Sequence, residues 1–189
     1  MRNGRISNIV QCFYDAPVPA MTNNVKLDNQ IEQFLTFELA DEAYGIEILK
    51  VQEIRGWEPV RKIPNTPVFV KGALNLRGTI VPIIDLRERF NLDHVDYTPT
   101  TVVIVISVAL DENNSCKMGI VADAVSDVLD INVADIRESP NLGSRINTRY
   151  IRGMYVGKKN MVLLLDVDKL LNPDEFMGIA ELPATPDIK

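Results

Sequence analysis

Hydrophobic and polar residues alternate over short stretches of this chain, which is the pattern of β-strands with one buried face. The alternation runs through 34–39 and 44–48, and Asp41 and Glu42 between them have turn chemistry. This arrangement predicts a hairpin, and 51–57 continues it as a third strand. Short strands separated by turn residues favour an all-β fold with only a few short helices.

Two apolar runs lack clear alternation and predict buried strands. One is 80–84, which we expect to pair with 74–77 across a turn at Gly78 and Thr79. The other, 101–106, is rich in β-branched residues, which favour strands.

The predicted helices are short. Thr66 suits a helix N-cap, Pro67 suits the first helical position, and Gly72 suits a left-handed C-cap, so a helix is expected over 67–71. Further short helices are predicted at 86–90 and 133–138 and near the C-terminus.

Three pieces of sequence recur in the same order, each displaced along the chain by nearly the same offset. The pairs are Gly45–Ile54 with Gly119–Val128, Thr66–Gly72 with Asn147–Gly153, and Val81–Leu86 with Val162–Val167. Constant order and nearly constant spacing predict an internal duplication. We therefore expect two tandem five-stranded barrels, with a cleft between them that is suited to binding.

These patterns divide the chain into one folded domain with a tail at each end. The expected segments are a disordered N-terminal tail at 1–31, the domain at 32–176 and a flexible tail at 177–189. Within the domain we expect barrel one at about 32–92, barrel two at about 99–167 and a short helix at 168–176.

Charge and composition exclude several classes of partner. The net charge is −6 and the basic residues do not cluster, which argues against binding to nucleic acid or to an anionic membrane surface. The sequence lacks an apolar run long enough to span a bilayer as a helix, so we expect no membrane insertion. Cys12 and Cys116 have no metal-ligand spacing, and a reduced, cytoplasmic protein is expected.

The sequence offers little catalytic chemistry. His94 is the sole histidine, and it lies in a polar linker without a metal partner or nucleophile nearby in sequence. Asp85 and Asp166 occupy equivalent positions in the repeats and are expected to cap short helices. The acidic run from Asp123 to Asp135 lacks calcium-loop spacing and predicts a solvated face. We expect no enzyme activity, cofactor or metal.

The most specific segment is 70–87, which contains KGALNLRGTIVPIIDL. It resembles the run K-G-x-x-N-x-R-G-x-I-x-P-[IV]-x-D-L of the CheW family of chemotaxis coupling proteins. The stretches 34–55, 102–128 and 150–171 are also similar to that family, so the likeness covers about 32–176. One departure is the loop over 111–117, which is longer than expected.

The resemblance implies two SH3-like barrels and an adaptor without enzyme activity. Such an adaptor couples transmembrane chemoreceptors to the histidine kinase CheA in bacterial chemotaxis arrays. The receptor's cytoplasmic helical hairpin would dock between the barrels, and the kinase's regulatory domain, of the same fold, would pair barrel to barrel. The protein would be cytoplasmic and recruited to the inner face of the membrane at receptor clusters.

Candidate contact residues follow mainly from this resemblance. They are Val51, Glu53, Ile54, Gly72, Asn75, Arg77, Val102 and Val103. We expect Arg77 to face the receptor groove and hypothesise that it pairs with Glu53 across neighbouring strands. Val102 and Val103 lie on opposite faces of one strand, so at most one of them contributes to an exposed surface.

Three alternatives remain open at this point. One is a regulatory module that serves a different kinase, such as one controlling surface motility. Another is a small-molecule-binding β-barrel with a closed apolar cavity. The third is an enzyme with an unrecognised carboxylate pair.

Overall fold

The computed structural model of this chain describes residues 30–92, 96–111, 114–138, 147–157 and 161–172. Strands dominate these residues, with two short α-helices and three 3-10 turns. In chain order the elements are β1 Ile31–Leu39, β2 Glu42–Glu47, η1 Ile48–Lys50, β3 Val51–Gly56, β4 Val70–Leu76, β5 Thr79–Asp85, α1 Leu86–Arg89, β6 Val102–Ala109, β7 Ser115–Ala122, β8 Ala124–Asn132, η2 Val133–Asp135, η3 Thr148–Tyr150, β9 Ile151–Val156, β10 Met161–Leu165 and α2 Val167–Leu170.

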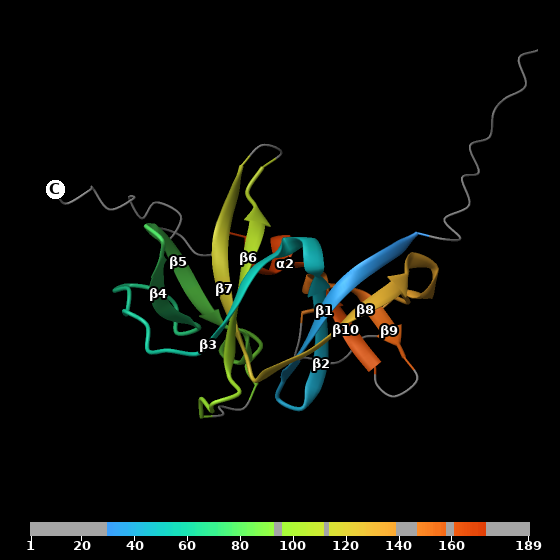
Figure 1. Cartoon of the computed structure of the whole chain (residues 1–189), viewed down its shortest axis with the longest axis horizontal. Helices are drawn as coiled ribbons and strands as arrows, with labels where there is room; N and C mark the ends of the chain where they lie inside the picture. The colour runs from blue at the N-terminus through green and yellow to red at the C-terminus, as the bar shows by residue number, and fades with distance from the viewer. Residues whose placement is uncertain (1–29, 93–95, 112–113, 139–146, 158–160, 173–189) are drawn as a thin grey trace, which may run out of the picture.

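The strands form two five-stranded sheets, which Figure 1 shows as two lobes side by side. The strand order is β8-β1-β2-β10-β9 in the first and β3-β6-β7-β5-β4 in the second. Backbone pairing of Arg137 with Met154 joins the ends of the first sheet, and pairing of Arg61 with Ala73 joins the ends of the second. We name the two lobes barrel A and barrel B in that order, and the predicted all-β fold of two barrels is confirmed.

The barrels exchange strands between the two sequence repeats. Barrel A combines β1 and β2 with β8, β9 and β10, whereas barrel B combines β3, β4 and β5 with β6 and β7. The sheets therefore do not divide the chain at 32–92 and 99–167 as predicted. A repeat identifies equivalent strands, but either copy of a hairpin can complete either sheet, so the pairing cannot be derived from the offset. The chain passes between the sheets at η1 and again at Asp123.

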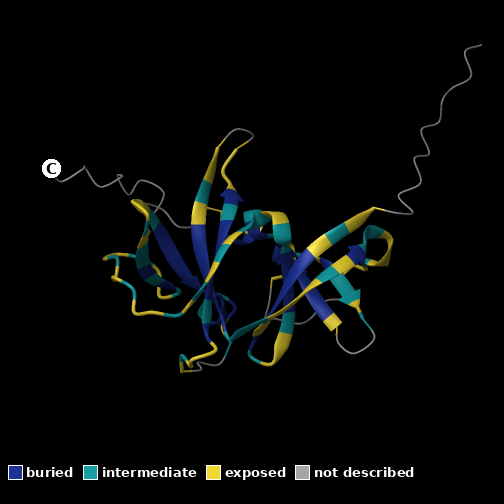
Figure 2. Cartoon of the chain, viewed as in Figure 1, coloured by how far each residue is buried: buried dark blue, intermediate teal, exposed yellow. Residues whose placement is uncertain are grey.

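The hydrophobic core has three parts. A cluster inside barrel B contains Val103 and Val105, and a smaller one inside barrel A contains Phe34 and Leu164. The largest cluster draws residues from both sheets and packs the barrels against each other. Figure 2 shows buried strand segments within both lobes, with exposed segments mainly toward the loops. This shared core occupies the space between the two sheets.

The shared core explains the apolar run at 101–106. Ile104 and Ile106 on β6 belong to the shared core, while Val103 and Val105 face the interior of barrel B. Because both faces of β6 are buried, the strand has no polar alternation.

The helix predicted over 67–71 is wrong. Residues 68–69 form a turn, the N–H of Val70 donates to the carbonyl of Pro67 at 2.9 Å, and β4 begins at Val70. Thr66 and Pro67 suit a turn as well as a helix start, and the pairing of Ala73 with Arg61 requires an extended chain here.

Gly72 is a buried strand residue and not a helix C-cap. Its φ is 150°, and a Cβ added there would lie 2.3 Å from the carbonyl oxygen of Arg61. Gly153, its equivalent in the repeat, would bring a Cβ within 2.9 Å of the carbonyl oxygen of Arg137. Both glycines therefore permit the close backbone approach that joins the ends of each sheet.

The capping prediction for the two aspartates is confirmed. Asp85 accepts a hydrogen bond from the N–H of Arg87 at the start of α1, and Asp166 accepts one from the N–H of Lys169 in α2. The helix α1 matches the prediction at 86–90, whereas the segment predicted helical at 133–138 contains only the short turn η2.

The two predicted tails fall almost wholly outside the described residues. Their described part is Gln30 and Ile31, where β1 already begins. Residues 173–176 of the predicted C-terminal helix also lie outside, and α2 ends at Leu170.

Candidate interaction surface

The third strand, β3, presents three of the candidate residues at one end of the strand order of barrel B. Exposed and half-buried residues alternate along it: Val51 and Glu53 are half-buried, and Ile54 is 44% exposed. Ile54 therefore offers an apolar side chain to a partner.

The two-residue turn between β4 and β5 presents Arg77. Arg77 and Gly78 have φ of 52° and 89°, a combination typical of the tight turns in β-hairpins. The side-chain oxygen of Asn75 accepts a hydrogen bond from the N–H of Gly78 at 2.8 Å and fixes the turn. Arg77 is exposed, so its guanidinium is accessible to a carboxylate on a partner.

The predicted pair of Glu53 and Arg77 is not formed. Glu53 Oε1 lies 3.7 Å from the Nε atom of Arg55. Within the described part of the chain, Arg77 takes part in no ion pair. The reason is topological: β3 pairs with β6 and β4 pairs with β5, and the chain meets β4 only at Arg61, beyond the end of β3.

Two other candidates are core residues. Val103 is fully buried inside barrel B, and Gly72 is buried at the closure of the sheet. Val102 is half-buried and packs against the shared core. The prediction that Val102 and Val103 lie on opposite faces is confirmed, and neither Val103 nor Gly72 is accessible to a partner.

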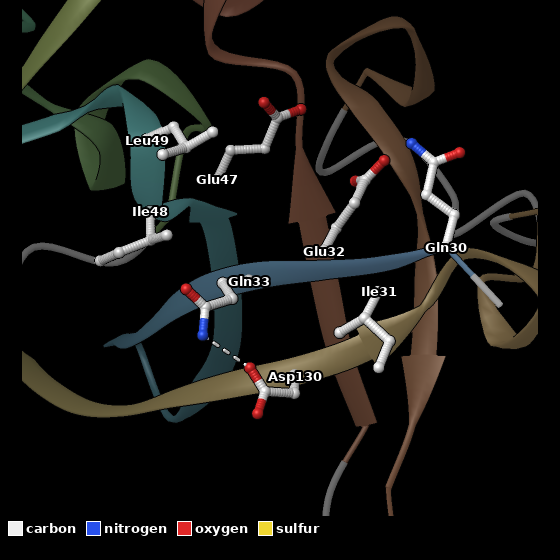
Figure 3. A pocket seen from close by; sticks show the side chains of 8 residues that line it. All are labelled: Gln30, Ile31, Glu32, Gln33, Glu47, Ile48, Leu49 and Asp130. Carbon is white, nitrogen blue, oxygen red and sulfur yellow. Dashed lines mark hydrogen bonds between the residues drawn. The ribbon is translucent and has the colours of Figure 1, made fainter.

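A second surface lies on barrel A next to the crossover at η1. It is a groove of about 580 Å³, and Figure 3 shows its lining residues, Gln30, Ile31, Glu32, Gln33, Glu47, Ile48, Leu49 and Asp130. Leu49 is 89% exposed and Ile31 is 64% exposed, which makes them the most accessible apolar side chains of the groove. The sequence prediction missed this surface. The one available clue was that Leu49 corresponds in the repeat to the polar Asp123.

Acidic side chains edge the groove. Arg152 Nη1 lies 2.7 Å from Glu32 and 2.5 Å from Glu47, so one cation bridges two carboxylates. Hydrogen bonding to Glu32 raises the pKa of Arg152, although partial burial opposes this. Asp130 accepts a hydrogen bond from Gln33 at 2.8 Å. With carboxylates beside exposed apolar side chains, the groove suits a partner that offers apolar and basic groups.

A buried ion network lies in barrel B. Arg87, 1% exposed, donates to both oxygens of Asp85 at 3.0 and 2.8 Å and to Asp123 at 2.8 Å. Burial opposes the charge of Arg87, but the hydrogen bond to Asp85 and the nearby carboxylates raise its pKa above the ordinary value. Tyr97 donates to Asp85 at 3.1 Å and stacks on Trp57.

The described residues hold no cluster of three or more His, Cys, Asp or Glu side chains arranged to bind a metal. His94 lies outside the described residues. Among the helices of the described ranges, none has the length and apolar character that a membrane span requires.

Comparison with known proteins identifies the family. Residues 33–175 match the family model of the CheW-like domain. The chain belongs to the CheW-like domain family. Chemotaxis protein CheW of Klebsiella aerogenes is 46% identical over 145 residues, which covers 77% of this chain and 84% of the relative. Protein FrzA of Myxococcus xanthus is 28% identical, with 79% of this chain and 91% of the relative covered.

A solved structure supports the same assignment. The crystal structure of the scaffolding protein TtCheW from Thermoanaerobacter tengcongensis has a TM-score of 0.67 and 30% sequence identity. The match covers 75% of this chain and 88% of that one. The resemblance inferred from residues 70–87 is therefore confirmed, together with the all-β fold.

Proposed function

We propose that this protein is a non-enzymatic adaptor that couples transmembrane chemoreceptors to the histidine kinase CheA. The observation that carries the proposal is the CheW-like match over residues 33–175. The relative from Klebsiella aerogenes is named a chemotaxis protein, and the solved relative is named a scaffolding protein. We propose a cytoplasmic protein, recruited to the inner face of the membrane where receptors cluster.

The receptor contact is proposed to use barrel B. Ile54 offers exposed apolar area on β3, and Arg77 offers a cation on the fixed turn between β4 and β5. A receptor's helical hairpin presents apolar residues in rows with charged residues beside them, and this pattern is complementary to such a surface. Contact with a partner carboxylate would use the guanidinium of Arg77, which has no ion partner within the described part of the chain.

The kinase contact is proposed to use the groove on barrel A. An adaptor that holds two partners at once needs two separate surfaces. The side chain of Leu49 is almost fully solvated, and burying it against an apolar partner would favour association by about 25 cal/mol per Å². The carboxylates beside it would select a partner surface with basic residues.

Receptor binding is tested by reversing the charge of Arg77. The Arg77→Glu variant should sediment with receptor-containing membranes about ten-fold less than the wild type, because it would place a carboxylate against the partner's carboxylate. Arg137→Glu makes the same charge change on barrel A, where the side chain is also exposed, and should sediment normally. Equal sedimentation of the two variants would reject the receptor surface.

Kinase binding is tested separately. Leu49→Glu should reduce co-purification of CheA without affecting receptor sedimentation. Val156→Glu replaces another exposed apolar side chain, on β9, and serves as the matched control. If CheA co-purifies with Leu49→Glu as well as with the wild type, the groove is not the contact surface for the kinase. Co-purification of a different kinase with the wild type would favour the surface-motility alternative.

A further inference from the structure

The two crossovers between the barrels have the same arrangement of hydrogen bonds, although the charged residues that form it differ between the two repeats. At each of them, one aspartate carboxylate is bonded to a side chain of opposite charge and to a backbone N–H at a hairpin. The three groups at each crossover come from both barrels. We call these arrangements the first clamp (Asp123, Arg87 and Ala40) and the second clamp (Asp168, Lys50 and Ala109).

The first clamp is centred on Asp123, the single residue between β7 and β8. One oxygen of its carboxylate accepts from Arg87 Nη1 at 2.8 Å, and Arg87 belongs to α1, which follows β5 of barrel B. The other oxygen accepts from the N–H of Ala40 at 2.8 Å, in the turn between β1 and β2 of barrel A. In addition, the N–H of Asp123 donates to the carbonyl of Glu38 at 2.9 Å. The carboxylate thus bonds to barrel B on one side and to barrel A on the other.

The second clamp is centred on Asp168 in α2, which follows β10 of barrel A. One oxygen accepts from Lys50 Nζ at 2.6 Å, and Lys50 lies in the crossover η1 between β2 and β3. The other oxygen accepts from the N–H of Ala109 at 2.9 Å, at the end of β6 in barrel B. Lys50 and Asp168 are partly buried, with side chains 27% and 35% exposed.

The two clamps use equivalent helix positions and crossover positions that differ by one residue, with the charges reversed. Arg87 and Asp168 are related by the same offset that relates Val81 to Val162, and each is in the short helix that follows the last strand of its repeat. Lys50 is one residue beyond Leu49, the repeat equivalent of Asp123. The helix supplies the cation in the first clamp and the carboxylate in the second. Because the same geometry recurs with opposite polarity, it is a property of the fold and not of one charge pair.

We propose that the two clamps set the relative orientation of the barrels, with Asp123 and Asp168 as positioning residues. The shared apolar core holds the barrels together, but apolar contact is non-directional and tolerates small sliding. A carboxylate bonded on both sides fixes one register, because any displacement lengthens charge-assisted hydrogen bonds. The inference extends the proposed function, since the receptor surface of barrel B and the kinase surface of barrel A would be held at a fixed angle.

The test measures the distance between the barrels in the free protein. Spin labels are attached to cysteines introduced at Thr79 on β5 and Val156 on β9, in a background that carries Cys12→Ser and Cys116→Ala. The distribution of distances between the two spin labels is recorded by pulsed electron paramagnetic resonance for Asp123→Ala and Asp168→Ala. Asp130→Ala is the matched control, because Asp130 on β8 accepts a hydrogen bond from Gln33 on β1, within barrel A only.

Both clamp variants should broaden the distance distribution, and the control should leave it unchanged. Asp168→Ala should also lower the hydrogen-exchange protection of the Ala109 amide about ten-fold, because a charge-assisted hydrogen bond is lost. If Asp123→Ala does not fold because of its buried partner Arg87, then Asp168→Ala decides the matter. A wild-type distribution and unchanged Ala109 protection in folded Asp168→Ala would overturn the proposal. No receptor or kinase is present, so the result is independent of the proposed function.

Discussion

Tyr44 shows how burial of a single residue changes chemistry in this protein. Its side chain is 1% exposed and stacks between Phe37 and Phe90, with ring centroids 5.9 and 6.2 Å away. Burial, together with the nearby charge of Glu42, raises the pKa of Tyr44 to about 12. The folded protein therefore keeps this phenol neutral at a pH where an exposed tyrosine ionises.

This raised pKa predicts a loss of stability at alkaline pH. In the unfolded chain Tyr44 ionises near pH 10, whereas in the folded protein it stays neutral until about pH 12. Its contribution to the free energy of unfolding is complete below about pH 10 and falls as the pH rises towards 12. Urea unfolding at about pH 9 and about pH 11 should show a smaller decrease for Tyr44→Phe than for the wild type. An equal decrease would show that Tyr44 does not titrate in this way.

The residues of the candidate surfaces differ in how far the sequence could predict them. The exposure of Asn75 and Arg77 followed from the turn chemistry around Gly78, which is local. The predicted ion pair between Glu53 and Arg77 was wrong because it assumed that their strands are neighbours. Which strands are neighbours is decided by the topology of the whole sheet and not by the local sequence. Leu49 was missed because an exposed leucine in a repeat of apolar residues resembles a core residue until its burial is known.

At the scale of elements, local patterns predicted strands well and the closure of the sheets poorly. The alternation at 34–39 and 44–48 and the apolar run at 101–106 correspond to β1, β2 and β6. The prediction of a helix over 67–71 was wrong because its capping residues fit a turn equally well. The pairing between Arg61 and Ala73 favours the extended chain over the helix. Such tertiary pairing leaves no local signal in the sequence.

The closure of each sheet at a glycine gives a prediction for these elements. In Gly72→Ala a Cβ would lie 2.3 Å from the carbonyl oxygen of Arg61, and in Gly153→Ala a Cβ would lie 2.5 Å from a methyl carbon of Ile136. Each variant should lower the free energy of unfolding by about 1–3 kcal/mol, as overpacking does. Gly72→Ala should lose more, because its φ of 150° also disfavours a side chain.

Gly56→Ala is the control for both variants. A Cβ at Gly56 would have no neighbouring atom within 4 Å, so the free energy of unfolding should change by less than about 0.5 kcal/mol. Urea denaturation of the three variants measures the difference. If Gly72→Ala and Gly153→Ala matched Gly56→Ala, close backbone approach would not be what the glycines provide.

At the scale of the whole molecule, the duplication was predicted but its consequence was not. The constant repeat offset identified equivalent strands, yet each barrel contains strands from both copies. This exchange explains why the barrels share their largest core cluster and why the chain crosses between them twice. Because each barrel contains strands from both repeats and the barrels share a core, unfolding of one barrel disrupts the other. The two barrels should therefore unfold as one cooperative unit.

The function proposed here depends on both barrels being present at once. The proposed receptor surface lies on barrel B and the proposed kinase surface lies on barrel A, and the shared core joins the two barrels. Under the proposed function, the protein would act by holding two partners at a fixed separation.

The most direct test of this account is reconstitution of receptor-containing membranes with CheA, with and without this protein. Radiolabelled phosphate incorporated into the kinase is followed as receptor ligand is added. With the protein present, phosphorylation should change with receptor ligand; when it is withheld, phosphorylation should stay at the level of the free kinase. Ligand-controlled phosphorylation in its absence, or ligand-independent phosphorylation in its presence, would contradict the adaptor function.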